Sequence, residues 1–316
     1  MLNTKPQISV LILTFNQAQF IQQAMQSVVE QQSNKYELEI IVTDDGSSDG
    51  TVDVIERFVE TSPVPIKVLA KKHEGVTAIA KNLLSMINLA NGEFIAFLAG
   101  DDSFSQSRFD LQLEKFAGNP NLKISYSDGI NCIDGDLGQR CHSAETADLM
   151  RSGTAEEVYK HLTSQTPVLF IQGVLAKTDF LKRIQPFDID LIADDWVFNI
   201  KVFDALVRCG GDFDFESSIC FIRNIHGENT SRNLLVHYER IRQVAERYCN
   251  YPRYIKSRFI GNAIYSAMKR RDLKTLAKFF KKSMVYPESF IWPLKALLRS
   301  LLAKFKSSLS QHRNIP

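Results

Sequence analysis

The segment that decides the fold is Gly92–Asp102, GEFIAFLAGDD. Its middle, Phe94–Leu98, is a run of apolar residues, which is typical of a strand buried on both faces of a sheet. Asp101 and Asp102 follow it, and adjacent carboxylates after a buried strand are costly unless a positive group meets them. Mg²⁺ and Mn²⁺ favour a few carboxylates together with phosphate oxygens. The alternative is that one aspartate caps the next helix and the other is solvated.

Strand and helix patterns alternate on both sides of this segment. Apolar runs predict further strands at Ile8–Thr14, Leu38–Thr43, Ile66–Leu69 and Lys123–Ser127. Helical periodicity predicts helices at Gln17–Gln31, Thr51–Val59, Val76–Leu89 and Ser105–Phe116. Such repeated units predict an α/β fold with a Rossmann-like, mostly parallel sheet flanked by helices.

The later residues carry a different mixture of patterns. Gly129–Gly153 is polar and glycine-rich, which predicts a long loop that could act as a lid. We expect strands in Val168–Ala176 and Asp212–Arg223, and a helix over Asp194–Val207. Beyond Ser231 the pattern is helical, with predicted helices at Asn233–Tyr248, Arg253–Lys269, Leu273–Met284 and Phe290–Phe305.

Polar clusters gather where predicted strands end. Thr14-Phe15-Asn16 follows the first strand and Asp44-Asp45-Gly46-Ser47-Ser48-Asp49 follows the second. Ligands of parallel sheets bind at the carboxyl ends of strands, so we expect these clusters to share a site with Asp101-Asp102. A carboxylate of the second cluster could bind a ribose or a base; a plain acidic turn before a helix is the alternative.

Two more clusters follow in the second half. Asp194-Asp195-Trp196 at a helix start suits a general base beside a ring that stacks on a sugar, or else an N-cap followed by a core tryptophan. Arg223–Ser231 combines a cation, an imidazole and hydroxyls that could bind a diphosphate or complete a metal shell. A surface loop with an incidental histidine is the alternative there.

Taken in order, the clusters resemble the motifs of family 2 glycosyltransferases of the GT-A fold, from Ile8 to about Ser231. That family has a strand ending in T-x-N, a V-D-D-G-S-x-D-x-T turn, an A-R-N helix, G-E-[YF]-I before metal-binding aspartates, a glycine-containing strand, a base motif and R-x-x-H-x-x-N-x-S. The similar residues here are Thr14–Asn16, Val42–Thr51, Gly75, Ala80-Lys81-Asn82, Gly92–Ile95, Asp101-Asp102, Gly173, Asp194-Asp195-Trp196, Arg223, His226, Asn229 and Ser231.

The resemblance implies a role for each matched residue. Donor contacts are implied for Thr14, Asn16, Asp45, Lys81, Asp101, Arg223 and His226. Asp102 and His226 would hold Mn²⁺ or Mg²⁺, Asp195 would be the general base, and Trp196 would contact the acceptor. Two departures stand out. Ala99 occupies a place where many members have another aspartate, and Lys81 replaces an arginine, so that a bidentate contact is lost.

The resemblance implies an inverting transferase. The donor would be a nucleotide diphosphate sugar, with UDP the commonest nucleotide in the family. The acceptor would be a hydroxyl of a saccharide or a lipid-linked molecule, in cell-surface polysaccharide or glycolipid synthesis. The alternative is a catalytically silent nucleotide-sugar-binding or scaffold protein of the same fold. A dinucleotide-dependent oxidoreductase is disfavoured because no GxGxxG follows a strand.

Charge divides the chain into two parts. Residues 231–316 carry 19 Lys and Arg against 4 Asp and Glu, whereas the preceding residues are acidic overall. We expect residues 1–231 to form the GT-A domain, with a nucleotide-binding half at 1–130 and an acceptor-binding half at 131–231, and residues 232–316 to form a basic helical region. The amphipathic pattern predicts contact with an anionic membrane surface through residues 288–306. A subdomain packed on the catalytic domain or on a second copy in a homo-oligomer is the alternative.

Composition adds further expectations about the surroundings. Five cysteines without CxxC spacing indicate neither a disulfide framework nor a zinc site, which favours a reducing compartment. There is no secretory leader pattern and no apolar run of spanning length. We therefore expect a cytoplasmic protein, peripheral at the inner membrane face, with no nucleic acid partner.

Overall fold

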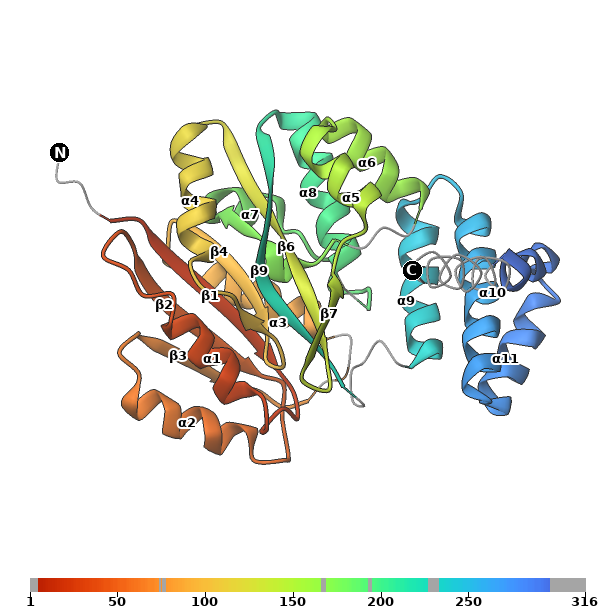
Figure 1. The fold of residues 1–316 in the computed structure, drawn as a ribbon, viewed down its shortest axis with the longest axis horizontal. Helices are drawn as coiled ribbons and strands as arrows, with labels where there is room; N and C mark the ends of the chain where they lie inside the picture. The colour runs from red at the N-terminus through yellow and green to blue at the C-terminus, as the bar shows by residue number, and fades with distance from the viewer. Residues whose placement is uncertain are drawn as a thin grey trace, which may run out of the picture. The chain divides into compact units, whose positions relative to one another are not determined.

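The computed structural model describes residues 5–73, 75, 78–165, 169–192, 195–226 and 233–295. The chain divides into an α/β unit, Met1–Leu162 with Thr166–Gly227, and a helical unit, Thr163–Gln165 with Glu228–Pro316 (Figure 1). The predicted boundary between residues 231 and 232 lies outside the described residues.

The α/β unit is built on one sheet. Within the described residues its strands are β1 (Gln7–Thr14), β2 (Glu37–Asp44), β3 (Ile66–Ala70), β4 (Phe94–Ala99), β5 (Ser103–Phe104), β6 (Leu122–Ile133), β7 (Asp136–Arg140), β8 (Leu175–Lys177) and β9 (Asp212–Ile225). Their order is β3-β2-β1-β4-β8-β6-β9-β5, with β7 paired to β6. β1 is parallel to its neighbours β2 and β4, and β2 is parallel to β3. β6 is parallel to β9, whereas β8 runs antiparallel to β4 and β6.

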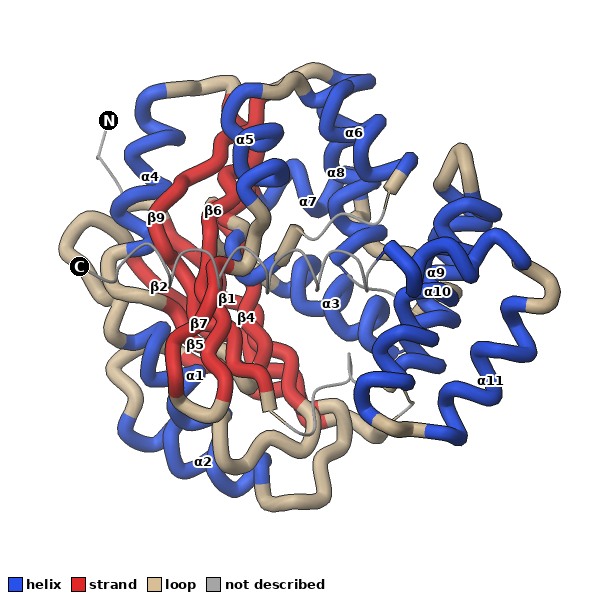
Figure 2. The backbone as a smooth tube through the Cα atoms, turned by 45° about the vertical axis from the view of Figure 1, so that its right-hand side comes forward, coloured by secondary structure: helices blue, strands red, loops and turns tan. Residues whose placement is uncertain are grey.

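Helices cover both faces of this sheet. They are α1 (Ile21–Val29), α2 (Thr51–Thr61), α3 (Ala78–Leu89), α4 (Arg108–Gly118), α5 (Ala144–Ser152), α6 (Ala155–Ser164), α7 (Thr178–Ile184) and α8 (Asp195–Cys209). Figure 2 shows α1, α2 and α4 on one side of the strands and α3, α7 and α8 on the other. Consecutive residues Val10, Leu11 and Ile12 of β1 are therefore all fully buried. The predicted α/β class is confirmed.

The predicted loop at Gly129–Gly153 is wrong. These residues complete β6 and form all of β7 and α5. The apolar pattern did not reveal the strand because its backbone partner lies far along the chain: Gly129 pairs with Phe221, and Ile133 with Ile225. Gly129 also has little room for a side chain, since a Cβ there would come within 2.4 Å of the Phe221 ring.

The expected strand at Val168–Ala176 is shorter than predicted. A 3-10 turn, η1 (Ile171–Gly173), precedes β8, and Val168 lies outside the described residues. The predicted helix over Asp194–Val207 begins at Asp195 as α8, with Asp194 also outside.

The helical unit has its own small core. Its described elements are α9 (Leu234–Tyr248), α10 (Pro252–Arg270), α11 (Leu273–Ser283) and η3 (Pro287–Phe290). Tyr238, Ile260, Ala263, Ile264 and Phe279 are buried together between them. Three predicted helices are thus confirmed; the fourth, Phe290–Phe305, lies mostly outside the described residues. None of the helices in the described part is both long and apolar enough to cross a bilayer.

Candidate functional site

The carboxylates after β4 are joined to the end of β9. Asp102 is buried; its Oδ1 accepts a hydrogen bond from the Asn224 backbone N–H at 2.9 Å, and its Oδ2 accepts one from Gln172 Nε2 at 2.8 Å. Oδ2 of Asp101 lies 3.0 Å from Nε2 of His226. The Asp101 carbonyl also accepts from Asn224 Nδ2 at 2.6 Å. The structure therefore brings Asp101, Asp102 and His226 together, as the motif order implied.

The Asp102 carboxylate is costly to ionise where no cation is near. Burial and then the charge of Asp101 raise the pKa of Asp102 to about 8, against the opposing effects of its hydrogen bonds and of Arg223. No cluster of three or more His, Cys, Asp or Glu ligands occurs among the described residues. An ion of the Mg²⁺ type often uses one or two carboxylates and takes its other oxygens from phosphates and water. The residues fit such a shared ion and do not form a closed protein cage.

The turn after β2 is held by its own side chains. Asp44 Oδ2 accepts from the backbone N–H groups of Gly46 and Ser47, at 3.0 and 2.9 Å. Asn16, which follows β1 with φ 52°, accepts from the Ser48 N–H at 2.9 Å and donates its own N–H to Ser47 Oγ. The Asn16 side chain thus shapes the loop beside the strand ends.

Asp45 lies at the centre of a second polar cluster. Its Oδ1 accepts from Asn82 Nδ2 at 2.7 Å, and its Oδ2 lies 2.8 Å from His73 Nδ1. The His73 ring stacks on Phe15, with centroids 4.2 Å apart and an interplanar angle of 11°. A flat pair of rings beside an oriented carboxylate can stack on a base and accept from its N–H.

The remaining predicted donor residues have different surroundings. Thr14 is buried and donates to Gln17 Oε1 at 2.8 Å. Lys81 is exposed on α3. Arg223 donates to Asn131 Oδ1 at 3.2 Å, and its guanidinium lies 5.1 Å over the Phe170 ring. Asn229 and Ser231 lie outside the described residues.

Asp195 and Trp196 open α8 and differ in environment. Asp195 Oδ2 accepts from the Ile171 N–H at 3.4 Å. Trp196 is only 7% exposed, and its indole N–H donates to the Leu162 carbonyl at 2.8 Å. Its ring packs in the interior, so the predicted stacking surface for an acceptor sugar is not found at Trp196.

Three contributors were missed from the sequence. Gln172 and Asn224 stand beside residues that the motifs singled out, Gly173 and Arg223. The Gln172 side chain contacts Asp102, and the Asn224 side chain contacts the Asp101 carbonyl. His73 lies in no motif. Only the tertiary structure brings it to Asp45.

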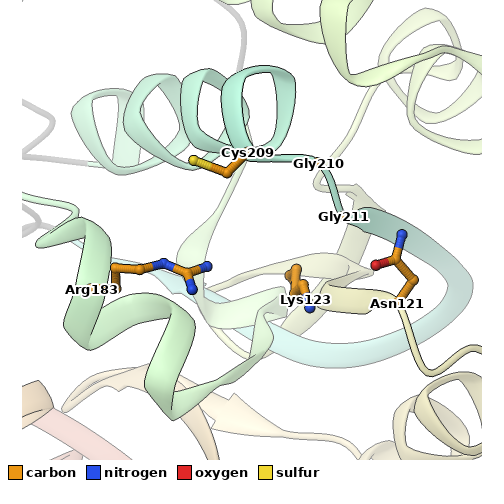
Figure 3. Close-up of a pocket in the computed structure, with 6 residues that line it drawn as sticks. All are labelled: Asn121, Lys123, Arg183, Cys209, Gly210 and Gly211. Carbon is orange, nitrogen blue, oxygen red and sulfur yellow. The ribbon is translucent and has the colours of Figure 1, made fainter.

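A cavity of about 410 Å³ lies elsewhere, as Figure 3 shows. Its lining residues are Asn121, Lys123, Arg183, Cys209, Gly210 and Gly211. They surround the beginnings of β6 and β9, whereas Arg223 and His226 belong to the far end of β9. This cavity is therefore separate from the aspartate cluster.

Comparison with known proteins adds a sequence relationship. Residues 9–136 match glycosyl transferase family 2. The chain is 24% identical over 230 residues to the hyaluronan synthase of Pasteurella multocida. The aligned region covers 73% of this chain and 22% of that protein. The chain thus spans about a fifth of the length of that curated relative.

Solved structures agree with the fold. S. aureus TarS 1–349, in complex with UDP-GlcNAc, gives a TM-score of 0.56 at 17% identity, covering 83% of this chain and 73% of that one. The mannosyltransferase PcManGT from Pyrobaculum calidifontis, in complex with GDP-Man and Mn²⁺, gives 0.58 at 16% identity, covering 96% and 89%. At these identities the likeness establishes the GT-A fold.

Proposed function

We propose that the chain, whose residues 9–136 match glycosyl transferase family 2 and whose fold is GT-A, transfers a sugar from a nucleotide diphosphate donor to an acceptor hydroxyl. The transfer is an inverting one that depends on Mn²⁺ or Mg²⁺. UDP is the favoured nucleotide, and the product belongs to a cell-surface polysaccharide or glycolipid. The likeness to a hyaluronan synthase and to a structure bound to UDP-GlcNAc supports this choice.

The observation that carries the proposal is the gathering of Asp101, Asp102 and His226. A buried carboxylate with a pKa of about 8 beside a second carboxylate is an electrostatic arrangement that a metal–diphosphate would relieve. Asp45 and the Phe15–His73 pair would receive the base at the other end of the donor.

Each chain residue has a distinct task in the proposed reaction. Asp195 accepts the proton of the acceptor hydroxyl as that oxygen attacks the anomeric carbon. His226 and Arg223 offset the charge that develops on the departing diphosphate. A metal bound at Asp102 would act as a Lewis acid on the same oxygens.

An assay of nucleoside diphosphate release tests the proposal. The protein is incubated with UDP-, GDP- and dTDP-sugars, with Mn²⁺, Mg²⁺ or EDTA, and with and without a saccharide acceptor. We expect release from one nucleotide class, loss in EDTA, and acceleration by acceptor. Tight donor binding without any release would favour the silent nucleotide-sugar-binding protein instead.

We propose further that the helical unit attaches to an anionic membrane surface at the cytoplasmic face. α11 and its neighbours expose Leu273 (76%), Phe280 (53%) and Met284 (67%), which line an apolar groove of about 810 Å³. The same segment carries lysines at residues 274, 278, 281 and 282, and Lys281 lines the groove. An apolar surface on a lysine-rich helix complements a negatively charged lipid interface. Of the predicted contact region 288–306, only residues 288–295 are described.

Vesicle flotation tests the attachment. Wild type should float with vesicles that contain phosphatidylglycerol and not with phosphatidylcholine alone, and Phe280→Glu with Met284→Glu should abolish flotation. The matched control is Lys35→Glu on the α/β unit, which should float normally. Flotation that persists in the double variant, or a shift to dimer that the variant abolishes, would contradict the lipid assignment.

A further inference from the structure

Arg108 places a cation in the interior of the α/β unit. Arg108, the first residue of α4, is fully buried, and burial lowers its pKa to about 10. No carboxylate among the described residues forms an ion pair with it. Its guanidinium lies 4.0 Å over the Phe104 ring. A buried charge without a counter-ion is costly unless hydrogen bonds compensate for the lost water.

Those partners are the carbonyls of one short turn. Arg108 Nη1 donates to the Gln172 carbonyl at 2.6 Å, and Nη2 donates to the Val174 carbonyl at 2.9 Å. Gln112, one helical turn later, accepts from Arg108 Nε at 3.2 Å and donates to the Gly173 carbonyl at 3.0 Å. Arg108 and Gln112 therefore hold three consecutive carbonyls of η1 and its C-terminal neighbour.

The same turn contacts both carboxylates of the proposed chemistry. The Ile171 N–H donates to Asp195, and the Gln172 side chain donates to Asp102. The carbonyls of the turn thus accept from Arg108. Its Ile171 N–H and its Gln172 side chain donate to the proposed base and to the proposed metal ligand. Asp102 and Asp195 are 93 residues apart in the sequence, and this turn contacts both of them.

We propose that Arg108 is a positioning residue for the transfer step, which it serves by fixing the turn that spaces Asp195 from Asp102. The inference rests on the proposed function. The planar fork of the guanidinium bridges two carbonyls in a fixed geometry, which the compact ammonium of a lysine does not reproduce and an apolar side chain lacks altogether. A small misplacement of the attacking and leaving groups reduces rate more than it reduces binding of the donor.

The test compares Arg108→Met and Arg108→Lys with wild type. We expect kcat for transfer to fall by about 10²-fold in Arg108→Met and by about tenfold or more in Arg108→Lys. KM for the donor, and the affinity for UDP with Mn²⁺, should stay within about threefold, because Asp102 keeps its bond from the Asn224 N–H and the Asp45 cluster is untouched. Gln112→Met, which loses only part of the same contact, should show a smaller fall of the same kind.

Controls separate positioning from stability. Phe116→Leu, on the same helix and packed on Phe94, loses buried contacts without touching the turn, and it should keep kcat at a comparable loss of thermal midpoint. If Arg108→Met fails to fold, Gln112→Met and Arg108→Lys carry the test. Wild-type kcat in these variants, or an equal fall in Phe116→Leu, would overturn the positioning role alone. A wild type that releases no nucleoside diphosphate would overturn the proposed function, and this role with it.

Discussion

Asp101 and His226 lie 3.0 Å apart although 125 residues separate them in the chain. The contact exists because β9 runs parallel to β6 and ends beside the loop that follows β4. His226 is also packed on Phe20, with ring centroids 4.5 Å apart. The imidazole is thereby held at the carboxylates where the diphosphate is proposed to lie.

His226→Ala should therefore reduce kcat for nucleoside diphosphate release by about 10²-fold, the usual effect of removing one donor to a developing negative charge. Steady-state kinetics at saturating donor measure this. A change in KM alone, with kcat intact, would place His226 in ground-state binding only.

Asp195→Asn should abolish most transfer while donor binding persists. Loss of a general base lowers kcat by about 10²- to 10⁴-fold. Asp204→Asn on the same helix, where Asp204 pairs with Arg208, is the matched control and should be fully active. Equal activity of the two variants would exclude Asp195 as the base.

The pKa of Asp102 predicts a pH dependence of stability. Its value is about 8 in the folded protein against an ordinary 3.8, so the folded state binds more protons than the unfolded state between these pH values. Without metal, the free energy of unfolding that depends on Asp102 then decreases as pH rises through this window.

Asp102→Asn removes that penalty. Its thermal midpoint relative to wild type should increase between about pH 4 and pH 8, with no such trend below pH 4. Thermal unfolding in EDTA across this range is the measurement. If the thermal midpoints of the two proteins changed with pH in the same way, the pKa of Asp102 would not be raised in the folded state.

Trp196→Phe should act on stability and not on the acceptor. The substitution leaves the buried Leu162 carbonyl without its indole donor, at a cost of about 1–3 kcal/mol. Chemical denaturation and acceptor KM should be measured together. An unchanged unfolding free energy with a raised acceptor KM would restore the stacking role for Trp196.

Local patterns were enough for the first half of the fold. Strands such as Ile8–Thr14 are buried on both faces, and their continuous apolar runs report that burial directly. The aspartate pair Asp101-Asp102 and the loop after β2 could be predicted because they follow such strands. Gly129–Gly153 could not, since its strand is specified by pairing with β9 and its residues are largely polar.

Sequence motifs predicted the charged residues of the candidate site but not the side chains that contact them. Asp102 and His226 have motif signals, whereas Arg108 and His73 act through contacts that depend on tertiary packing. For Trp196, the motif predicted an acceptor contact at a residue that the structure buries. An aromatic ring after an aspartate fits both a sugar platform and a core residue, and only its burial decides between them.

The most direct test is calorimetric titration of UDP into the protein with Mn²⁺ and with EDTA. We expect Mn²⁺ to increase UDP affinity by about tenfold or more, and we expect this gain to disappear in Asp102→Asn. Metal-independent UDP binding, or an equal gain in Asp102→Asn, would contradict a shared metal–diphosphate site at these aspartates.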